Sequence, residues 1–208
     1  MVLSTKKYFL ILVIFIIFII GWLFNFVVTI KAPINIFTLS TSPNKVLSTI
    51  VDKQYQKPTL VQIPSVNIVA NVERVGIDKN GAMGVPKNFN NVGWLSSSSK
   101  LGQTGNLVMS GHYDTTTGAP AAFYNLTKVN VGDLLYIDTQ LSSGLKSTKV
   151  YKVTQSYLVD PNNKDHIKDV YKNTKVPTIT LITCNGIWDS VASEYSNRLV
   201  VKGELVAN

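Results

Sequence analysis

Cysteine, histidine and charge are all scarce in this chain. Its 208 residues include one cysteine and two histidines. A single cysteine excludes an intrachain disulfide, and so few thiols and imidazoles exclude a Cys-rich zinc site or an iron–sulfur cluster. We therefore predict neither a metal ion nor a cofactor. Charged residues make up 15% of the chain, against roughly 25% in an average soluble domain, so one part must be unusually apolar.

The apolar part is residues 8–30, a run of 23 residues without a charge. As a helix, this run reaches about 35 Å, enough to cross a hydrocarbon core of ~30 Å with some tilt. A cleaved signal peptide is the alternative. The run is longer than the roughly 7 to 15 apolar residues of such a peptide, and no small-residue cleavage site follows it. The sequence therefore predicts an uncleaved transmembrane anchor.

The charges around the anchor predict its orientation. Lys6 and Lys7 precede it and only Lys31 follows closely, so the positive-inside bias places residues 1–7 in the cytoplasm and the rest outside the cell membrane.

Beyond residue 31 the chain keeps 17 basic and 12 acidic residues. The lysines are scattered and form no stripe with aromatics, so nucleic-acid binding is not expected. A mildly basic surface fits an anionic membrane or cell wall better.

Residues 31–57 are predicted to be a linker. A Ser/Thr/Asn/Pro stretch covers residues 38–44, and apolar residues then recur at helical spacing over 46–55. This spacing predicts a short amphipathic helix that packs on the following domain, in preference to one lying on the membrane. Residues 58–208 have the length of one compact domain with its own core.

Within residues 58–208, short runs rich in β-branched residues alternate with turn signals. Convincing long helices are absent, and the best short ones are Ala121–Leu126 and Lys164–Tyr171. Seven or eight short strands with so little helix predict an all-β fold, a closed or nearly closed barrel rather than a parallel α/β sheet. The predicted strands are Leu60–Ile63, Val66–Val72, Asn106–Gly111, Leu134–Asp138, Val150–Tyr157, Thr178–Thr183 and Leu199–Val206.

Cys184 is the only thiol that could act as a nucleophile. It follows the apolar strand Thr178–Thr183 and precedes Asn185-Gly186, a turn signal. A side chain at the exit of a buried strand is held rigidly near the surface, which suits a nucleophile. Taken alone, a lone cysteine is also compatible with a small buried hydrophobic residue.

Histidine and arginine offer two candidates each. His112 leaves a predicted strand beside Gly111, whereas His166 lies in a polar segment, so His112 is the preferred acid/base partner of the thiol. Arg198 begins the last strand, whereas Arg74 fits a surface ion pair. An arginine keeps its charge and can donate two hydrogen bonds to a carbonyl or oxyanion, which a lysine does less well.

These residues together resemble the sortases, the cysteine transpeptidases of bacterial surfaces. Thr180-Leu181-Ile182-Thr183-Cys184 matches the TLxTC signature of that family. Gly111-His112 is similar to its histidine motif, Tyr195–Val201 to its arginine strand, and Ile63–Val66 to its opening strand. The order His, Cys, Arg and the N-terminal anchor agree with the family, and the resemblance covers nearly all of residues 58–206.

The resemblance implies an eight-stranded sortase β-barrel and a two-step acyl transfer. Cys184 would attack a threonine carbonyl of an LPxTG-like sorting signal and form a thioester. His112 would protonate the leaving amine and later deprotonate an incoming amine from a cell-wall precursor or surface protein. Arg198 would position the carbonyl and stabilise the oxyanion, and Thr183 would support the site through its hydroxyl. These roles agree with the chemistry of each group.

The segments Gly111–Asp114 and Gly118–Tyr124 look most similar to class D, E or F sortases, and residues 32–57 contain no lid motif typical of pilus-building members. Asp114 is too close in sequence to His112 to orient its ring easily, so a loop or turn role is expected. The acidic residues show no calcium-binding cluster. The alternatives are a membrane-anchored barrel that binds wall peptides without catalysis, and a sortase-like hydrolase. A thiol close to both the His112 ring and the Arg198 guanidinium, beside a groove, favours the enzyme.

Overall fold

The structure, a computed structural model, describes residues 56–79, 81–140 and 146–207. The predicted anchor, residues 8–30, lies outside these residues, and so does the amphipathic helix predicted over 46–55. Within the described ranges, no helix combines the length and the apolar composition that a membrane span requires.

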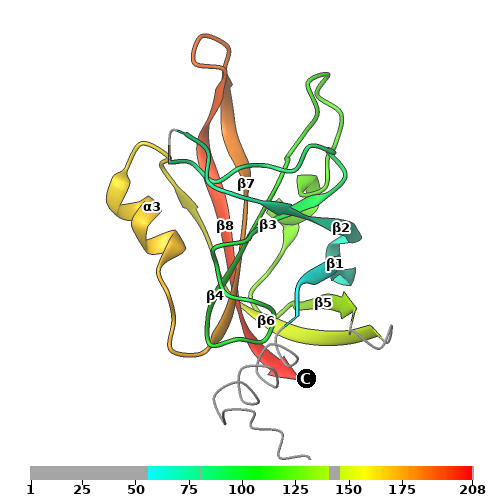
Figure 1. The fold of residues 1–208 in the computed structure, drawn as a ribbon. Helices are drawn as coiled ribbons and strands as arrows, with labels where there is room; N and C mark the ends of the chain where they lie inside the picture. The colour runs from blue at the N-terminus through cyan, green and yellow to red at the C-terminus, as the bar shows by residue number, and fades with distance from the viewer. Residues whose placement is uncertain (1–55, 80, 141–145, 208) are drawn as a thin grey trace, which may run out of the picture. The chain divides into compact units, whose positions relative to one another are not determined.

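Eight strands form a closed barrel in the order β1-β2-β3-β4-β7-β8-β6-β5 (Figure 1). The closing pair is β1 with β5, and it is antiparallel. The neighbours β2–β3 and β4–β7 are parallel, and the remaining pairs are antiparallel. The strands are β1 (Pro58–Ile63), β2 (Ile68–Val75), β3 (Val92–Leu95), β4 (Gly105–Gly111), β5 (Leu134–Gln140), β6 (Lys146–Val159), β7 (Pro177–Asp189) and β8 (Glu194–Ala207).

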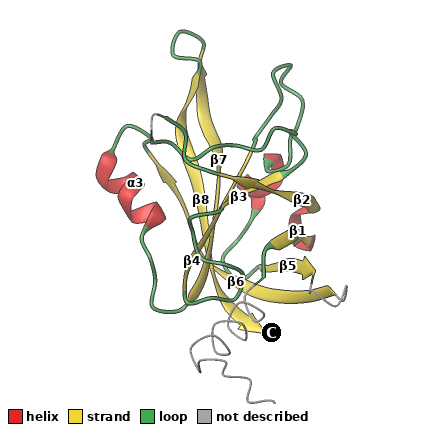
Figure 2. Cartoon of the chain, in the orientation of Figure 1, coloured by secondary structure: helices red, strands yellow, loops and turns green. Residues whose placement is uncertain are grey.

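Helices are few and short among the described residues (Figure 2). They are the 3₁₀ turns η1 (Pro64–Val66) and η2 (Tyr124–Lys128) and the helix α3 (Lys164–Tyr171). The bounds predicted for α3 are confirmed. The helix predicted over 121–126 is wrong in type and position, because only the 3₁₀ turn η2 forms there. The all-β barrel class is confirmed.

All seven predicted strands are present, although most extend further than predicted. The strand predicted from Val66 begins two residues later, because Pro64 starts the turn η1 and Asn67 has a left-handed backbone, φ 55°. The strand β3 was not predicted. It has four residues, all buried, and Gly93 interrupts its apolar pattern.

The barrel is filled by the inward side chains of all eight strands. In β5, burial alternates along the strand, with Leu135 and Ile137 fully buried. In β4 every residue is buried, because its inner face meets the core and its outer face is covered. On that outer face, the Asn106 amide donates to the Val170 and Lys172 carbonyls at the end of α3. A strand that is covered on both faces is typically apolar at most positions, and not only at alternate ones.

The helix α3 packs on the outside of the barrel. Val170 joins Val159 and Val200 in a second buried cluster, against which Ile167 and Tyr171 pack. The Asn163 side chain caps the helix by accepting from the backbone N–H groups of residues 165 and 166. This packing fixes one wall of the cavity described below.

Candidate active site

The parallel strands β4 and β7 pair almost to the end of β4, and β7 then continues to Asp189. Their last ladder pair is Ser110 with Ile182. One residue further, the buried Thr183 hydroxyl donates a 2.9 Å hydrogen bond to the Gly111 carbonyl. This bond extends the pairing past the ladder. His112 therefore follows the end of β4, whereas Cys184 lies within β7, one position after Thr183. The predicted strand exit at Cys184 is wrong, because β7 continues through Asn185 and Gly186.

Cys184 and Arg198 are direct partners across the antiparallel β7–β8 pair. On its other side, Arg198 pairs with Val159 at the end of β6. Both Cys184 and Arg198 are half-buried. Directly opposed residues on one sheet have Cβ atoms about 5 Å apart. The sheet register therefore brings the predicted nucleophile and the predicted oxyanion group together.

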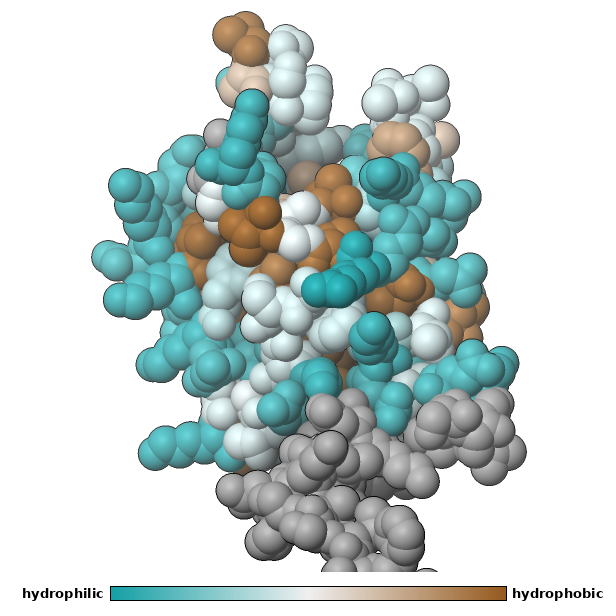
Figure 3. Space-filling view, in the orientation of Figure 1, coloured by the Kyte–Doolittle hydropathy of each residue, from teal (hydrophilic) through white to brown (hydrophobic). Residues whose placement is uncertain are grey.

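A cavity of about 340 Å³ opens over this pair. Its walls come from the β2–β3 connection, from α3, from the ends of β4 and β6, from the middle of β7 and from the first half of β8. The face seen in Figure 3 carries hydrophobic side chains beside α3 and toward the middle of the molecule, framed by hydrophilic ones. The cavity is therefore an apolar groove with a thiol and a guanidinium in its wall. Its lining includes Met83, Val85, Thr183, Cys184, Glu194, Arg198, Ile167 and Tyr171.

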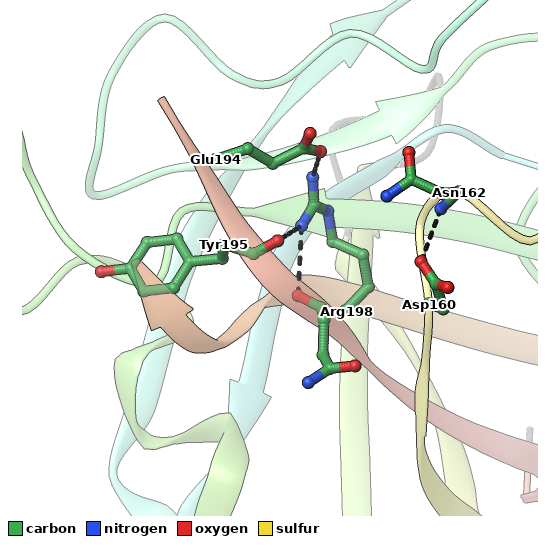
Figure 4. Close-up of polar contacts among 6 residues, drawn as sticks. Asp160, Asn162, Glu194, Tyr195 and Arg198 are labelled. Carbon is green, nitrogen blue, oxygen red and sulfur yellow. Dashed lines mark hydrogen bonds and ion pairs between the residues drawn. The ribbon is translucent and has the colours of Figure 1, made fainter. Parts of the chain in front are cut away.

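The Arg198 guanidinium is held by three hydrogen bonds (Figure 4). Nη1 donates to the Tyr195 carbonyl at 2.9 Å and to the Asn197 carbonyl at 3.1 Å. Nη2 donates to the Glu194 carboxylate, with which it forms an ion pair. The guanidinium therefore lies back along its own strand. An arginine has more N–H groups than these bonds use, so donors remain for a ligand.

The His112 ring is oriented by the connection between β2 and β3. Its Nε2 lies 3.0 Å from the Pro86 carbonyl, and its face packs against Phe89 with ring centroids 4.6 Å apart. A carbonyl can only accept, so Nε2 carries the proton and Nδ1 is the basic nitrogen of the neutral ring. Among the described residues, no hydrogen bond joins this ring to the Cys184 thiol. Such contacts are often loose without substrate.

Asp114 has the loop role expected for it, together with a contact that was not predicted. It forms a single bridge with Pro120 in the loop after β4, and its carboxylate accepts a 2.5 Å hydrogen bond from the Tyr195 hydroxyl. Tyr195 also packs edge-on against Tyr113 and Trp188. These contacts tie the loop after His112 to the strand that carries Arg198.

Opposing influences act on the Cys184 thiol. Burial is the largest and raises its pKa, the Arg198 guanidinium lowers it, and the carboxylates of Asp114 and Glu194 raise it. The net direction is upward, so the thiol is mainly protonated at neutral pH in the free protein. Arg198 and Glu194 line the same cavity as the thiol, and Asp114 is bonded to Tyr195 on the strand that carries both of them.

The two alternative candidates lie elsewhere. His166 is exposed in the first turn of α3, and Arg74 is exposed on β2. Glu194 and Tyr195 were missed as site residues. A Glu four residues before an Arg has no special meaning in a strand pattern, so only the hairpin geometry reveals the pair. Among the described residues, no group of three or more His, Cys, Asp or Glu side chains could hold a metal ion.

Comparison with known proteins gives one family. The model of the Sortase domain matches residues 61–206, most of the chain. No curated protein matches the sequence significantly. The match spans all eight strands of the barrel except the ends of β1 and β8.

Solved structures give the same result. Listeria monocytogenes sortase A is 25% identical with a TM-score of 0.52, over 73% of this chain and 88% of that one. Streptococcus agalactiae sortase C1 is 22% identical with a TM-score of 0.54, over 82% and 80%. The Clostridium perfringens sortase D5 transpeptidase is 20% identical with a TM-score of 0.52, over 81% and 91%.

Sortases A, C and D match with similar TM-scores, so these similarities do not support the predicted placement in class D, E or F. They agree with the barrel fold. The chain belongs to the sortase family and is a cysteine transpeptidase.

Proposed function

We propose that this sortase cleaves an LPxTG-like sorting signal through a thioester on Cys184 and transfers the acyl group to an amine of a cell-wall precursor or surface protein. The observation that carries the proposal is the cross-strand pairing of Cys184 with Arg198 in the wall of one apolar cavity. A thiol and a fixed cation beside a groove suit attack on a peptide carbonyl.

In the first step, the Cys184 sulfur attacks the carbonyl carbon of the threonine and its thiol proton passes to His112. The negative charge that develops on the carbonyl oxygen is stabilised by donors of Arg198. The C–N bond to the glycine then breaks, and the His112 imidazolium gives its proton to the leaving amine. The product is a thioester on Cys184, with a neutral imidazole beside it.

In the second step, the incoming amine attacks the thioester carbonyl. His112 takes a proton from this amine, Arg198 again stabilises the oxyanion, and the C–S bond breaks to return the cysteine thiolate, which recovers a proton. The new amide bond joins the sorted protein to the amine. If water took the place of the amine, the same steps would give hydrolysis.

The apolar wall of the cavity supports an apolar peptide as the substrate. Met83 and Val85 from one side, and Ile167 and Tyr171 from the other, line the groove that leads to Cys184. Burial of apolar side chains in such a groove favours binding by about 25 cal/mol per Å² of surface removed from water. The leucine and proline of an LPxTG-like signal are suited to it.

We also propose that residues 8–30 anchor the enzyme in the cell membrane as a single pass, with the catalytic domain outside. The support comes from the uncharged run of 23 residues and from the lysines before it. Residues 31–57 would then be the linker from the membrane to the barrel. This arrangement would place the groove where exported proteins emerge.

The test uses the full-length protein in detergent and a fluorogenic peptide with a Leu-Pro-x-Thr-Gly signal. We expect Cys184→Ala to abolish turnover and thioester formation. We expect His112→Ala and Arg198→Ala each to lower kcat/KM by roughly 100-fold or more without unfolding the barrel. Wild-type turnover by Cys184→Ala would contradict the mechanism.

The chain offers matched controls for the His112→Ala and Arg198→Ala substitutions. His166→Ala and Arg74→Ala remove the same side chains from exposed positions, so we expect turnover close to that of the wild type.

A peptide library, screened with and without added amines, would identify the preferred signal. If the added amine becomes joined to the cleaved peptide, the enzyme catalyses transfer. If the cleaved peptide ends in a free carboxylic acid, the enzyme catalyses hydrolysis.

A further inference from the structure

The inference concerns Glu194, the first residue of β8, and it rests on the function proposed above. Glu194 lines the same cavity as Cys184 and Arg198, and its carboxylate forms the ion pair with the Arg198 guanidinium. We propose that Glu194 is a positioning residue that holds this guanidinium beside the Cys184 thiol.

The contact depends on the shape of the β7–β8 hairpin. Residues four apart in a strand lie about 13 Å apart along it, so they meet only if a long side chain runs back along the chain. Arg198 does so, because its guanidinium also donates to the Tyr195 and Asn197 carbonyls. Figure 4 shows the guanidinium between these carbonyls and the Glu194 carboxylate.

A β-bulge contributes to this geometry. The register between β7 and β8 shifts between Asn185 and Trp188, so β7 has one residue more than β8 there. The backbone N–H of Ile187 is satisfied by the Ser196 hydroxyl at 3.0 Å. A bulge bends and twists the strands on which it lies, and this one lies between the Cys184–Arg198 pair and Glu194.

Among the described residues, the Glu194 carboxylate is the only charged hydrogen-bond partner of the guanidinium. Both backbone carbonyls accept from Nη1, whereas Glu194 accepts from Nη2. Without Glu194, the guanidinium would be held through Nη1 alone and could turn away from the groove. The Arg198 side chain is 21% exposed and that of Glu194 is 43% exposed, so the value of the pair lies in orientation more than in stability.

Glu194 also acts on the thiol through its charge. It opposes the guanidinium, which lowers the pKa of Cys184, and together with Asp114 it raises that pKa. Positioning and charge can therefore be separated by two substitutions. Glu194→Gln removes the charge and keeps a hydrogen-bond acceptor, whereas Glu194→Ala removes both. The charged groups that act on the thiol are Arg198 and Glu194 on β8 and Asp114 after β4. Titratable groups near it are Tyr195 on β8, Tyr171 on α3 and His112, which follows Gly111 of the cavity wall.

The first measurement is turnover of the fluorogenic sorting peptide by the full-length protein. We expect Glu194→Ala to lower kcat/KM by about 10-fold to 100-fold, mainly through kcat, because the oxyanion donor is misplaced. Glu194→Gln is expected to recover most of that loss. Glu204→Gln, an exposed carboxylate on the same strand, is the matched control and should behave as wild type. A folded Glu194→Ala protein with wild-type or higher turnover would overturn the proposal.

The second measurement is the pH dependence of Cys184 alkylation by iodoacetamide, which requires no sorting signal. In Glu194→Gln, the guanidinium stays beside the thiol, and the negative charge that raises the pKa of Cys184 is absent. Alkylation is therefore expected to begin at a lower pH than in the wild type. In Glu194→Ala the guanidinium is also released, so the shift is smaller. Identical profiles for the two variants would overturn the positioning role. If the wild type cleaves no sorting peptide, the proposed substrate fails while this measurement still decides the role of Glu194.

Discussion

The Thr183 hydroxyl donates its hydrogen bond to the Gly111 carbonyl at the point where the β4–β7 ladder has ended. Each of these residues is followed directly by a proposed catalytic group, His112 or Cys184. The bond therefore fixes the spacing between the end of β4, which precedes the proposed acid/base, and the part of β7 that carries the proposed nucleophile. A backbone carbonyl and a buried hydroxyl hold this spacing without any charged group.

Replacement of Thr183 by valine keeps the shape of the side chain and removes the hydroxyl. The Gly111 carbonyl would then lose its buried partner, at a cost of about 1 to 3 kcal/mol in the free energy of unfolding. Turnover is also expected to fall, because this hydrogen bond no longer joins the end of β4 to the part of β7 that carries Cys184. Urea denaturation and the peptide assay measure the two effects. Thr183→Ser, which keeps the donor, is the control, and a valine variant as stable and active as wild type would contradict this role.

The contact between His112 Nε2 and the Pro86 carbonyl predicts the tautomer of the ring. Because the carbonyl accepts, the neutral imidazole carries its proton on Nε2 and leaves Nδ1 basic. Nitrogen-15 chemical shifts of labelled histidine in the full-length protein measure this directly, with the exposed His166 as an internal reference. A neutral His112 with its proton on Nδ1 would show that the Pro86 contact does not exist in solution.

Much of the barrel was predictable from the sequence, because its strands follow local rules. In β5, the alternation of buried and exposed residues matches the period of a strand. The short strand β3 was missed because Gly93 breaks the pattern, and its burial depends on partners in β2 and β4. The helix predicted over Ala121–Leu126 failed for a related reason: the backbone N–H groups of Ala121 and Phe123 donate to the carbonyls of Tyr113 and His112, and only a 3₁₀ turn follows.

The site was predictable to a lesser extent. The strand exit at His112 follows from the apolar run before it, whereas Cys184 lies inside β7 and the exit predicted there is wrong. The sheet register explains the meeting of Cys184 with Arg198. The contacts of Glu194 with Arg198 and of Asp114 with Tyr195 depend on a bulge and on the path of a loop. Neither feature has a periodic signal, so only the structure could reveal them.

The bond from Tyr195 to Asp114 predicts a change of stability at high pH. The carboxylate stabilises the protonated phenol, and together with burial it raises the pKa of Tyr195 from 10.0 to about 12. Because the folded pKa lies above the unfolded one, the stabilisation is complete below pH 10 and is lost as the pH rises toward 12. The stability difference between wild type and Tyr195→Phe is therefore expected to narrow over that range.

Chemical denaturation of the wild type and of Tyr195→Phe at a series of pH values measures this difference in stability. The other tyrosines titrate in both proteins, so their contributions cancel in the difference. Absorbance at the tyrosinate band gives a second readout. We expect Asp114→Ala to move the pKa of Tyr195 back toward its ordinary value. A stability difference that stays constant through the whole alkaline range would contradict the assigned bond.

Gly186 provides a test of the hairpin geometry on which the Arg198 contacts depend. Its φ is +94°, and a Cβ at this position would lie 2.3 Å from the Ser196 hydroxyl oxygen and 2.9 Å from the Asn197 side-chain nitrogen. Gly186→Ala must therefore strain its own backbone and displace Ser196 and Asn197, whose side-chain atoms it would meet. We expect a loss of about 1 to 3 kcal/mol in the free energy of unfolding.

Turnover is expected to fall by more than this loss of stability explains, because displacement of residues 196 and 197 moves the backbone next to Arg198. The control is Gly76→Ala, since Gly76 has no positive φ and no atom within 4 Å of the added Cβ. Thermal denaturation and the peptide assay at a temperature where both variants are folded separate the two effects. If folded Gly186→Ala turned over like Gly76→Ala, the bulge would have no part in placing the guanidinium, and the contacts of Arg198 would have to arise from the strand alone.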